Sequence, residues 1–272
     1  MTFLDRTRSP NLLMAVFTLV GKGTLRVLGN FGAIAVFFSL ALVNVFRRKQ
    51  FREIVDQVYY IGARSSLIVL LVGLFTGMVL GLQLFYTLVK FGSVGALGSA
   101  ISLTLVREMG PVLTAIMITA RAGSGIAAEV GMLRMSEQVD ALYTMGVDPV
   151  RYLISPRIAA SIISFPLLTA FFDLIGIIGG YISGVLLLGT HEGTYFYRVQ
   201  SSIHMVDVRG GFIKALVFAV IVSCVCCFQG YFCHMRPGGY GSKAVGLATV
   251  SAVVLSCVLI LVADYVVTSF IM

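Results

Sequence analysis

Five long stretches that are almost free of charge constrain this sequence of 272 residues more than any other feature. They are residues 65–89, 91–120, 158–190, 210–233 and 244–272. Together they hold only five charged residues: Arg107, Glu108, Asp173, Lys214 and Asp264. A bilayer core about 30 Å thick is crossed by a helix of roughly 20 apolar residues, and continuous apolar runs lack the alternation of a membrane β-barrel. The stretches therefore predict an all-α polytopic membrane protein with five spans.

The overall composition excludes a soluble protein. Charged residues make up 12% of the chain and the mean hydropathy is +0.97, whereas a soluble domain carries about a quarter charged residues. The net charge of +8 would otherwise suggest a nucleic-acid partner. In this composition the basic residues are better explained as juxtamembrane lysines and arginines, and no nucleic acid is expected as a partner.

A sixth apolar stretch, Phe31–Phe46, is shorter than a span and has basic residues on both sides. Arg6, Arg8, Lys22 and Arg26 precede it, and Arg47, Arg48, Lys49 and Arg52 follow it. Because basic flanks stay in the cytoplasm, both of its ends should lie on the same side of the membrane. We therefore expect this stretch to dip into the membrane or lie in its interface without crossing, after an interfacial helix over residues 11–30.

The distribution of lysine and arginine predicts a cytoplasmic N-terminus. With five spans, the segments 1–64, 121–157 and 234–243 share one side and contain 15 of the 20 basic residues. A six-span alternative would place the 121–157 loop outside, against this bias. We expect a single domain over residues 1–272, with an interfacial region (1–64) before a five-span bundle (65–272). No apolar stretch before residue 30 ends in a small-residue cleavage site, so no signal peptide is expected.

Small residues follow regular patterns in the apolar stretches. Glycine recurs every fourth residue in the first span (Gly73, Gly77, Gly81) and in the third (Gly176, Gly180, Gly184). Such stripes allow helices to pack closely in lipid without implying transport. Pro111 and Pro166 are expected to bend their helices.

Neither cysteine nor histidine spacing indicates a metal site. All five cysteines (Cys224, Cys226, Cys227, Cys233 and Cys257) lie in apolar stretches and are expected to pack as small hydrophobic residues. His191, Glu192 and His204 do not form a zinc motif.

The segment 121–157 is too polar to span the membrane and too patterned to be disordered. Ser136–Met145 is predicted as a short amphipathic helix that Ser136 caps, with Gly146 as its stop and Pro149 beyond it. A rigid helix between two spans on the basic side suits the docking of a cytoplasmic partner. An ordinary interhelical loop is the alternative.

The same segment carries a resemblance. Its pattern is Glu137-Gln138-x-Asp140-Ala141-Leu142-x-x-Met145-Gly146-Val147-Asp148-Pro149-x-x-Tyr152-Leu153-x-x-Pro156-Arg157. Two further matches are Arg107-Glu108-x-Gly110-Pro111, and Ala120-Arg121-Ala122-Gly123-Ser124 with Glu129. Combined, these motifs resemble the MlaE (YrbE-type) permease family over essentially the whole chain.

This resemblance implies the transmembrane subunit of an ABC transporter in the inner membrane of a Gram-negative bacterium. Family members work as homodimers with a cytoplasmic ATPase, a STAS-domain protein and a periplasmic hexamer of MCE-domain lipid-binding proteins. They move phospholipids between the inner and outer membranes and maintain outer-membrane lipid asymmetry. The string Gly238–Lys243 lacks the spacing of a Walker A loop. The chain is thus expected not to be an enzyme and to need no cofactor of its own, with ATP bound by the partner.

Two groups of residues are candidates for function. For coupling to the ATPase we expect Glu129, Glu137, Asp140, Leu142, Met145, Gly146, Pro149 and Arg157. For a lipid path or intramembrane charge network we expect Arg107, Glu108, Lys214 and Asp264, because an unpaired charge in hydrocarbon costs several kcal/mol. Glu108 with Lys214 is the preferred pair. The alternative is that these four charges only hold the bundle together. Asp173 has no counterpart in the family pattern.

The expected mechanism is a cavity at the dimer interface, lined by apolar walls, where Arg107 and Lys214 meet the lipid headgroup. ATP binding on the partner would move the 136–145 helix and compress the cavity. Two other functions stay open. An ion-coupled secondary carrier would use Glu108, Asp173 or Asp264 as relays, and a non-transporting scaffold would be insensitive to changes in the buried charges.

Overall fold

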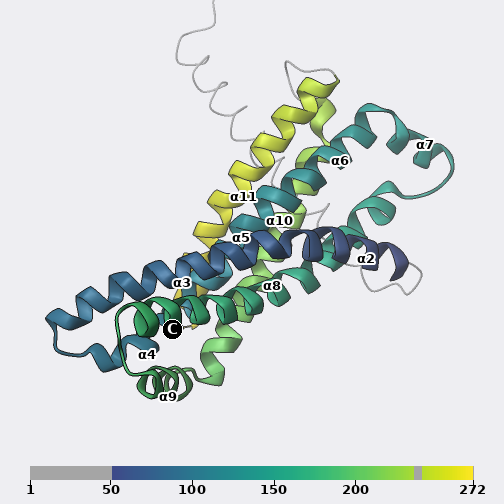
Figure 1. Cartoon of the computed structure of the whole chain (residues 1–272). Coiled ribbons are helices and arrows are strands. Elements are labelled where there is room, and N and C mark those ends of the chain that lie inside the picture. The colour runs from purple at the N-terminus through teal and green to yellow at the C-terminus, as the bar shows by residue number, and fades with distance from the viewer. Residues whose placement is uncertain (1–50, 236–240, 272) are drawn as a thin grey trace, which may run out of the picture.

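The computed structural model describes residues 51–235 and 241–271, and in these ranges every regular element is helical. The predictions for residues 11–30 and Phe31–Phe46 lie outside the described residues. The α-helices are α2 (Phe51–Val58), α3 (Arg64–Lys90), α4 (Leu97–Thr104), α5 (Gly110–Ile118), α6 (Ser124–Met135), α7 (Gln138–Thr144), α8 (Ser155–Tyr181), α9 (Glu192–Ser202), α10 (Met205–Tyr231) and α11 (Ser242–Ile271). They form the elongated bundle of Figure 1.

Five continuous helical segments of the described chain are long and apolar enough to cross a membrane. They are Phe51–Lys90, Val94–Met135, Val150–Leu187, Met205–Tyr231 and Ser242–Ile271. Short π-helical turns join the α-helices within the first two segments, for example Leu105–Met109 between α4 and α5, and flank α8 in the third. The prediction of an all-α polytopic membrane protein is confirmed, and all five predicted spans are found in the described residues.

The second segment is longer than the sequence predicted. Residues 121–135 were assigned to a loop because of their polarity, yet the helix continues through α6 to Met135. The reason is that α6 buries an apolar face with Ile126, Ala127 and Val130, while its polar residues occupy the other side. At 1.5 Å per residue the 42-residue segment is about 63 Å long. It therefore extends well beyond a bilayer core, and the loop shrinks to residues 136–149.

The short helix α7 lies in this loop, but it begins differently from the prediction. Ser136 does not cap it: its hydroxyl donates to the Leu133 carbonyl oxygen (3.4 Å), and Glu137 precedes the helix in a left-handed conformation with φ 59°. The predicted stop at Gly146 is confirmed. Gly146 has φ +73°, and the amides of Gly146 and Val147 donate to the carbonyls of Tyr143 and Leu142, which is the hydrogen-bond pattern of a Schellman motif.

The helices α3 and α8 run side by side through both glycine stripes (Figure 1). Gly77 lies directly against the backbone of Gly176, so a Cβ at position 77 would overlap the Gly176 carbonyl. At Gly73 a Cβ would lie 3.0 Å from the carbonyl oxygen of Phe172. The stripes therefore bring two backbones into contact, as expected for small residues in a membrane bundle.

The most buried of the five segments is α10, which packs against α5, α6, α8 and α11. Backbone contacts hold both of its ends: a Cβ at Gly211 would lie 2.7 Å from the Val106 carbonyl oxygen, and one at Gly230 would lie 2.6 Å from the Ala127 carbonyl oxygen. The cysteines pack here as predicted, with Cys224, Cys226 and Cys227 buried in α10.

A small cap closes the end of the bundle where α4 contacts α9. Tyr195 of α9 is buried, and its hydroxyl donates to the Ile177 carbonyl oxygen in α8 (2.9 Å). Burial raises the pKa of Tyr195 above its usual range, so the hydroxyl keeps the proton that it donates. The rings of Tyr181 and Phe196 pack edge-to-face against the Tyr195 ring.

Candidate functional site

The first turns of α10 place polar and small residues on one face. Asp207, Gly210, Gly211 and Lys214 follow the helical spacing that aligns residues three, four and seven apart. The two glycines leave room for another helix, and Gly211 contacts the carbonyl of Val106 in the second span. The long side chains on either side of the glycines thus reach the segment around Arg107 and Glu108.

The backbone of the second span is irregular at this point. Leu105–Met109 form a π-helical turn and Pro111 lies in the first turn of α5. Because proline has no N–H, Pro111 cannot donate to the carbonyl of Arg107 four residues earlier. The Lys214 ammonium donates to that carbonyl instead, with 2.9 Å between Nζ and O.

Lys214 is the centre of the cluster, and only 4% of its side chain is exposed. Its Nζ donates to Glu108 Oε2 at 2.6 Å and lies 3.0 Å from Asp264 Oδ1. The contact to Asp264 is an ion pair whose angles fall outside hydrogen-bond geometry. Two of the three ammonium protons are thus donated, to Glu108 and to the Arg107 carbonyl, and Asp264 adds a contact between opposite charges. The predicted pair of Glu108 and Lys214 is confirmed, and Asp264 from α11 joins it.

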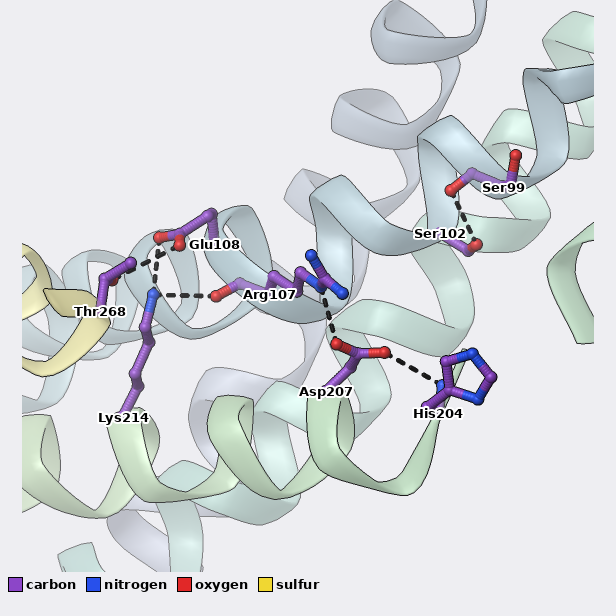
Figure 2. A network of polar contacts seen from close by, with 8 residues as sticks. All are labelled: Ser99, Ser102, Arg107, Glu108, His204, Asp207, Lys214 and Thr268. Atoms are coloured by element: carbon purple, nitrogen blue, oxygen red, sulfur yellow. Dashed lines mark hydrogen bonds and ion pairs between the residues drawn. The ribbon is translucent and has the colours of Figure 1, made fainter. Parts of the chain in front are cut away.

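Thr268, one turn after Asp264, completes this side of the cluster. Its hydroxyl lies 2.8 Å from the Asp264 carbonyl oxygen and 3.4 Å from Glu108 Oε1. The shorter distance marks the Asp264 carbonyl as the acceptor of the hydroxyl proton. Three spans therefore meet at Lys214, as Figure 2 shows.

A second ion pair lies one to two turns away. Arg107 Nε donates to Asp207 Oδ1 at 2.7 Å, and Asp207 Oδ2 accepts the backbone N–H of His204 at 3.0 Å, which caps α10 (Figure 2). The sequence analysis missed Asp207 because it placed the start of this span at residue 210. The seven-residue spacing from Lys214 is the signal that would have found it, since it puts both side chains on one face.

These residues surround a pocket with a volume of about 230 Å³. Its wall is formed by Arg107, Glu108, Asp207, Lys214 and Thr268, by Gly210 and Gly211, and by the apolar Val206 and Ile271. The Arg107 side chain is 41% exposed and that of Glu108 is 37% exposed, whereas Lys214 is covered. Arg107 and Glu108 are thus the charged groups that a molecule entering the pocket would meet.

The predicted coupling residues lie at the other end of α10. From Asp207 to Tyr231 this helix runs about 36 Å at 1.5 Å per residue. There Arg134 of α6 pairs with Asp140 of α7 at 2.7 Å, and the hydroxyls of Tyr143 and Tyr231 lie 3.0 Å apart. The Arg134 guanidinium also lies 5.5 Å from the centre of the Tyr231 ring. The helix α7 is therefore fastened to both α6 and α10.

The remaining predicted coupling residues divide into exposed and buried ones. Glu137, Met145 and Gly146 are exposed, Leu142 is half-buried and Pro149 is buried. Arg157 is buried too: its guanidinium lies 3.0 Å from Glu129 Oε2 and also donates to the carbonyl of Leu153. Since 5% of its side chain is exposed, Arg157 joins α8 to α6 and presents no docking surface of its own.

Asp173 lies apart from both clusters. Its Oδ1 is buried beside the α-carbon of Gly110, where a Cβ would overlap it, and it finds no hydrogen-bond partner among the described residues. It does not belong to the wall of the pocket.

Comparison with known proteins shows which family this chain resembles over most of its length. Residues 54–270 match the model of the family described as Permease MlaE. The chain belongs to this family. A probable ABC transporter permease protein of Rickettsia bellii is 38% identical over 258 residues, which cover 94% of this chain and 98% of the relative. The intermembrane phospholipid transport system permease protein MlaE of Haemophilus influenzae is 41% identical, over 82% and 84% of the two chains.

The chain is also similar to a plant protein. The protein TRIGALACTOSYLDIACYLGLYCEROL 1, chloroplastic, of Arabidopsis thaliana is 33% identical over 88% of this chain and 67% of its own length. The predicted resemblance to the MlaE permeases is thus confirmed, and the chain is a multi-pass permease. The residues that match the family, 54–270, include α7 and, except for Ile271, the residues that line the pocket.

Proposed function

We propose that this permease is the membrane subunit of an ABC transporter that moves phospholipids between the inner and outer membranes and so maintains outer-membrane lipid asymmetry. The observation that carries the proposal is the polar pocket, in which the second and fourth spans supply charged side chains to one partly open wall and the fifth span adds Thr268 and Ile271. The name of the Haemophilus relative as a phospholipid transport permease supports the substrate.

The proposal includes an assembly. The chain forms a homodimer in the bacterial inner membrane with its N-terminus in the cytoplasm. A cytoplasmic ABC ATPase docks at α7 and binds the ATP, and a STAS-domain protein and a periplasmic hexamer of MCE-domain proteins complete the complex. The permease contributes no catalytic residue and needs no cofactor. The names of the relatives as ABC transporter permeases support the ATPase as a partner.

The geometry separates the roles of the two cations that were expected to meet the headgroup. Lys214 is buried and already contacts the Arg107 carbonyl, Glu108 and Asp264, so it positions the other groups. Arg107 reaches Asp207 through Nε only, and its side chain remains partly exposed on the wall. A guanidinium binds phosphate well. Arg107 is therefore the group that we assign to the phosphate of the headgroup.

Movement of the ATPase would reach the pocket through α7. This helix is fastened to Arg134 and Tyr231, and Tyr231 ends the helix whose first turns carry Asp207 and Lys214. A displacement of α7 would therefore pull on α10 and change the shape of the pocket at its far end.

The test is purification in mild detergent followed by reconstitution with a separate acceptor membrane. We expect an ATPase to co-purify with the chain, and labelled phospholipid to leave the vesicles only when ATP is supplied. Transport that follows an ion gradient without an ATPase would instead show the secondary carrier. A bound ATPase with no lipid movement under any condition would show the scaffold.

The docking surface has its own test. Reversing Asp140 would break its pair with Arg134, so we choose the exposed Glu137 and Met145. The double change Glu137→Lys and Met145→Glu should abolish ATPase co-purification while the chain stays folded. Arg198→Glu, a charge reversal on the exposed face of α9, is the matched control and should leave the ATPase bound.

A further inference from the structure

Carboxylates outnumber cations around the pocket. The two cations Arg107 and Lys214 stand among three carboxylates, Glu108, Asp207 and Asp264, each of which has an oxygen within 3.0 Å of a cation. Asp207 is matched by Arg107, whereas Glu108 and Asp264 share Lys214. The cluster therefore has one carboxylate more than it has cations.

One of these carboxylates, Glu108, reaches the pocket. Of the two carboxylates that share Lys214, only Glu108 belongs to the wall. Its Oε2 accepts a hydrogen bond from Lys214, and its Oε1 lies 3.4 Å from the Thr268 hydroxyl. That hydroxyl directs its proton to the Asp264 carbonyl at 2.8 Å. Among the described residues, Oε1 is thus an acceptor that still lacks a strong donor.

Arg107 supplies the complementary group. Its Nε donates to Asp207, and its two terminal nitrogens form no hydrogen bond with another of the described residues. Arg107 and Glu108 are adjacent in the chain and both line the pocket. The wall therefore offers a positively charged hydrogen-bond donor, Arg107, beside a carboxylate acceptor, Glu108.

We propose that this pocket selects phospholipids whose headgroup is zwitterionic and ends in a primary amine, with the phosphate on Arg107 and the ammonium on Glu108 Oε1. This inference rests on the proposed function and adds the headgroup class. An anionic headgroup would bring a further negative charge beside Glu108 and would offer its carboxylate no charged donor. A zwitterionic headgroup adds no net charge and gives the free carboxylate oxygen a charged donor.

The size of the pocket fits a headgroup better than a whole lipid. Its volume of about 230 Å³ is below the range of roughly 300–1,000 Å³ for pockets that enclose drug-sized ligands. The apolar Val206 and Ile271 form part of the wall. They would contact the first carbons of the acyl chains, while the headgroup contacts the polar side chains.

The experiment uses the full chain with its co-purified ATPase in nanodiscs that contain equal amounts of three phospholipids. Phosphatidylethanolamine has the amine, phosphatidylcholine has the same charge without N–H donors, and phosphatidylglycerol is anionic but keeps hydroxyl donors. After transfer to detergent and washing, mass spectrometry quantifies the retained lipids. We expect phosphatidylethanolamine to exceed phosphatidylglycerol by roughly tenfold, with phosphatidylcholine between them. Equal retention, or an excess of phosphatidylglycerol, overturns the proposal.

Two variants remove the same charge at different places. Glu108→Gln removes it at the wall and should reduce the preference for phosphatidylethanolamine to about twofold or less. Asp264→Asn removes it behind Lys214, outside the wall, and should keep the order of the three lipids. An equal loss of preference in both variants would show that net charge alone selects, and would overturn the contact at Glu108. If Glu108→Gln does not fold, the comparison of the amine with the choline lipid in the unaltered chain still decides.

The two proposals fail differently. If no phospholipid of any class is retained or transferred, the proposed function itself is wrong. If all three lipids are retained and transferred equally, the permease function stands and only the headgroup selection is wrong.

Discussion

The contact between α3 and α8 and the cluster around Lys214 both join helices within the membrane-spanning segments, by opposite means. At Gly77 and Gly176 two backbones touch with no side chain between them. At Lys214 one long side chain joins the second, fourth and fifth spans through a carbonyl and two carboxylates. The glycine contact has one geometry, because any added atom overlaps the neighbouring backbone. The charge cluster instead offers Lys214 several acceptors, so its contacts can be exchanged one at a time, which agrees with the proposed role as a substrate pocket.

The largest effect that we expect comes from removing the centre of the charge cluster. Lys214→Ala leaves Glu108 and Asp264 facing each other without a cation. Breaking a buried ion pair in this way costs about 3–5 kcal/mol, so the yield of folded chain in detergent should fall sharply and lipid transfer should be lost. Thermal unfolding monitored by fluorescence-detected size exclusion measures the loss. A variant as stable as the unaltered chain would show that the cluster does not hold the spans together.

Glu108→Ala sharpens this result, because it leaves Lys214 paired with Asp264. The expected cost is about 1–3 kcal/mol, clearly smaller than that of Lys214→Ala in the same assay. Exchanging the two charges, with Glu108→Lys and Lys214→Glu together, should not restore stability. The new carboxylate at position 214 would lie against Asp264. Full recovery in the exchanged variant would mean that Asp264 plays no part.

The glycine contact is broken by a single methyl group. Gly77→Ala places a Cβ onto the Gly176 backbone, and the strain should lower the stability of the chain by about 1–3 kcal/mol. Gly246→Ala in α11 is the matched control, since nothing lies within 4 Å of a Cβ there. The control should be neutral or slightly more stable. Equal midpoints of thermal unfolding for both variants would contradict the packing of α3 on α8.

The smallest effect is expected from the tyrosine pair at the far end of α10. Tyr143→Phe and Tyr231→Phe remove the same hydrogen bond and should each lower stability by about 1 kcal/mol. Their double variant should cost no more than either one, because the bond can be lost only once. Lipid transferred per ATP hydrolysed should fall equally in all three. Additive losses would show that the two hydroxyls act separately.

The sequence predicted the glycine contact more completely than the charge cluster. A repeat of four residues fixes which face of a helix is small, so Gly73, Gly77 and Gly176 could be assigned to a packing face without knowing the partner. The five spans followed from the same kind of local pattern. Residues 121–135 were misassigned because average polarity conceals an apolar face on one side of α6.

The pairing of charges depends on contacts that no local pattern determines. Glu108 and Lys214 are 106 residues apart, and their pairing was inferred only because few charges lie in the spans. Asp207 was missed, since it falls just outside the apolar stretch. Arg157 was expected at a docking surface on the evidence of its place in a motif, but it is buried against Glu129. Burial of a charged side chain depends on the partner that a distant helix brings to it.

The carbonyl and the carboxylate that bind Lys214 also impose an order on biosynthesis. Arg107 and Glu108 leave the ribosome 106 or 107 residues before the lysine that contacts them. At 5–20 residues per second this interval is about 5–20 s. During that time the second span contains the side chains of Arg107 and Glu108 and the Arg107 carbonyl, all without Lys214. Each of these polar groups opposes entry into lipid. We therefore expect the second span to become stable in lipid only after the fourth span has been made.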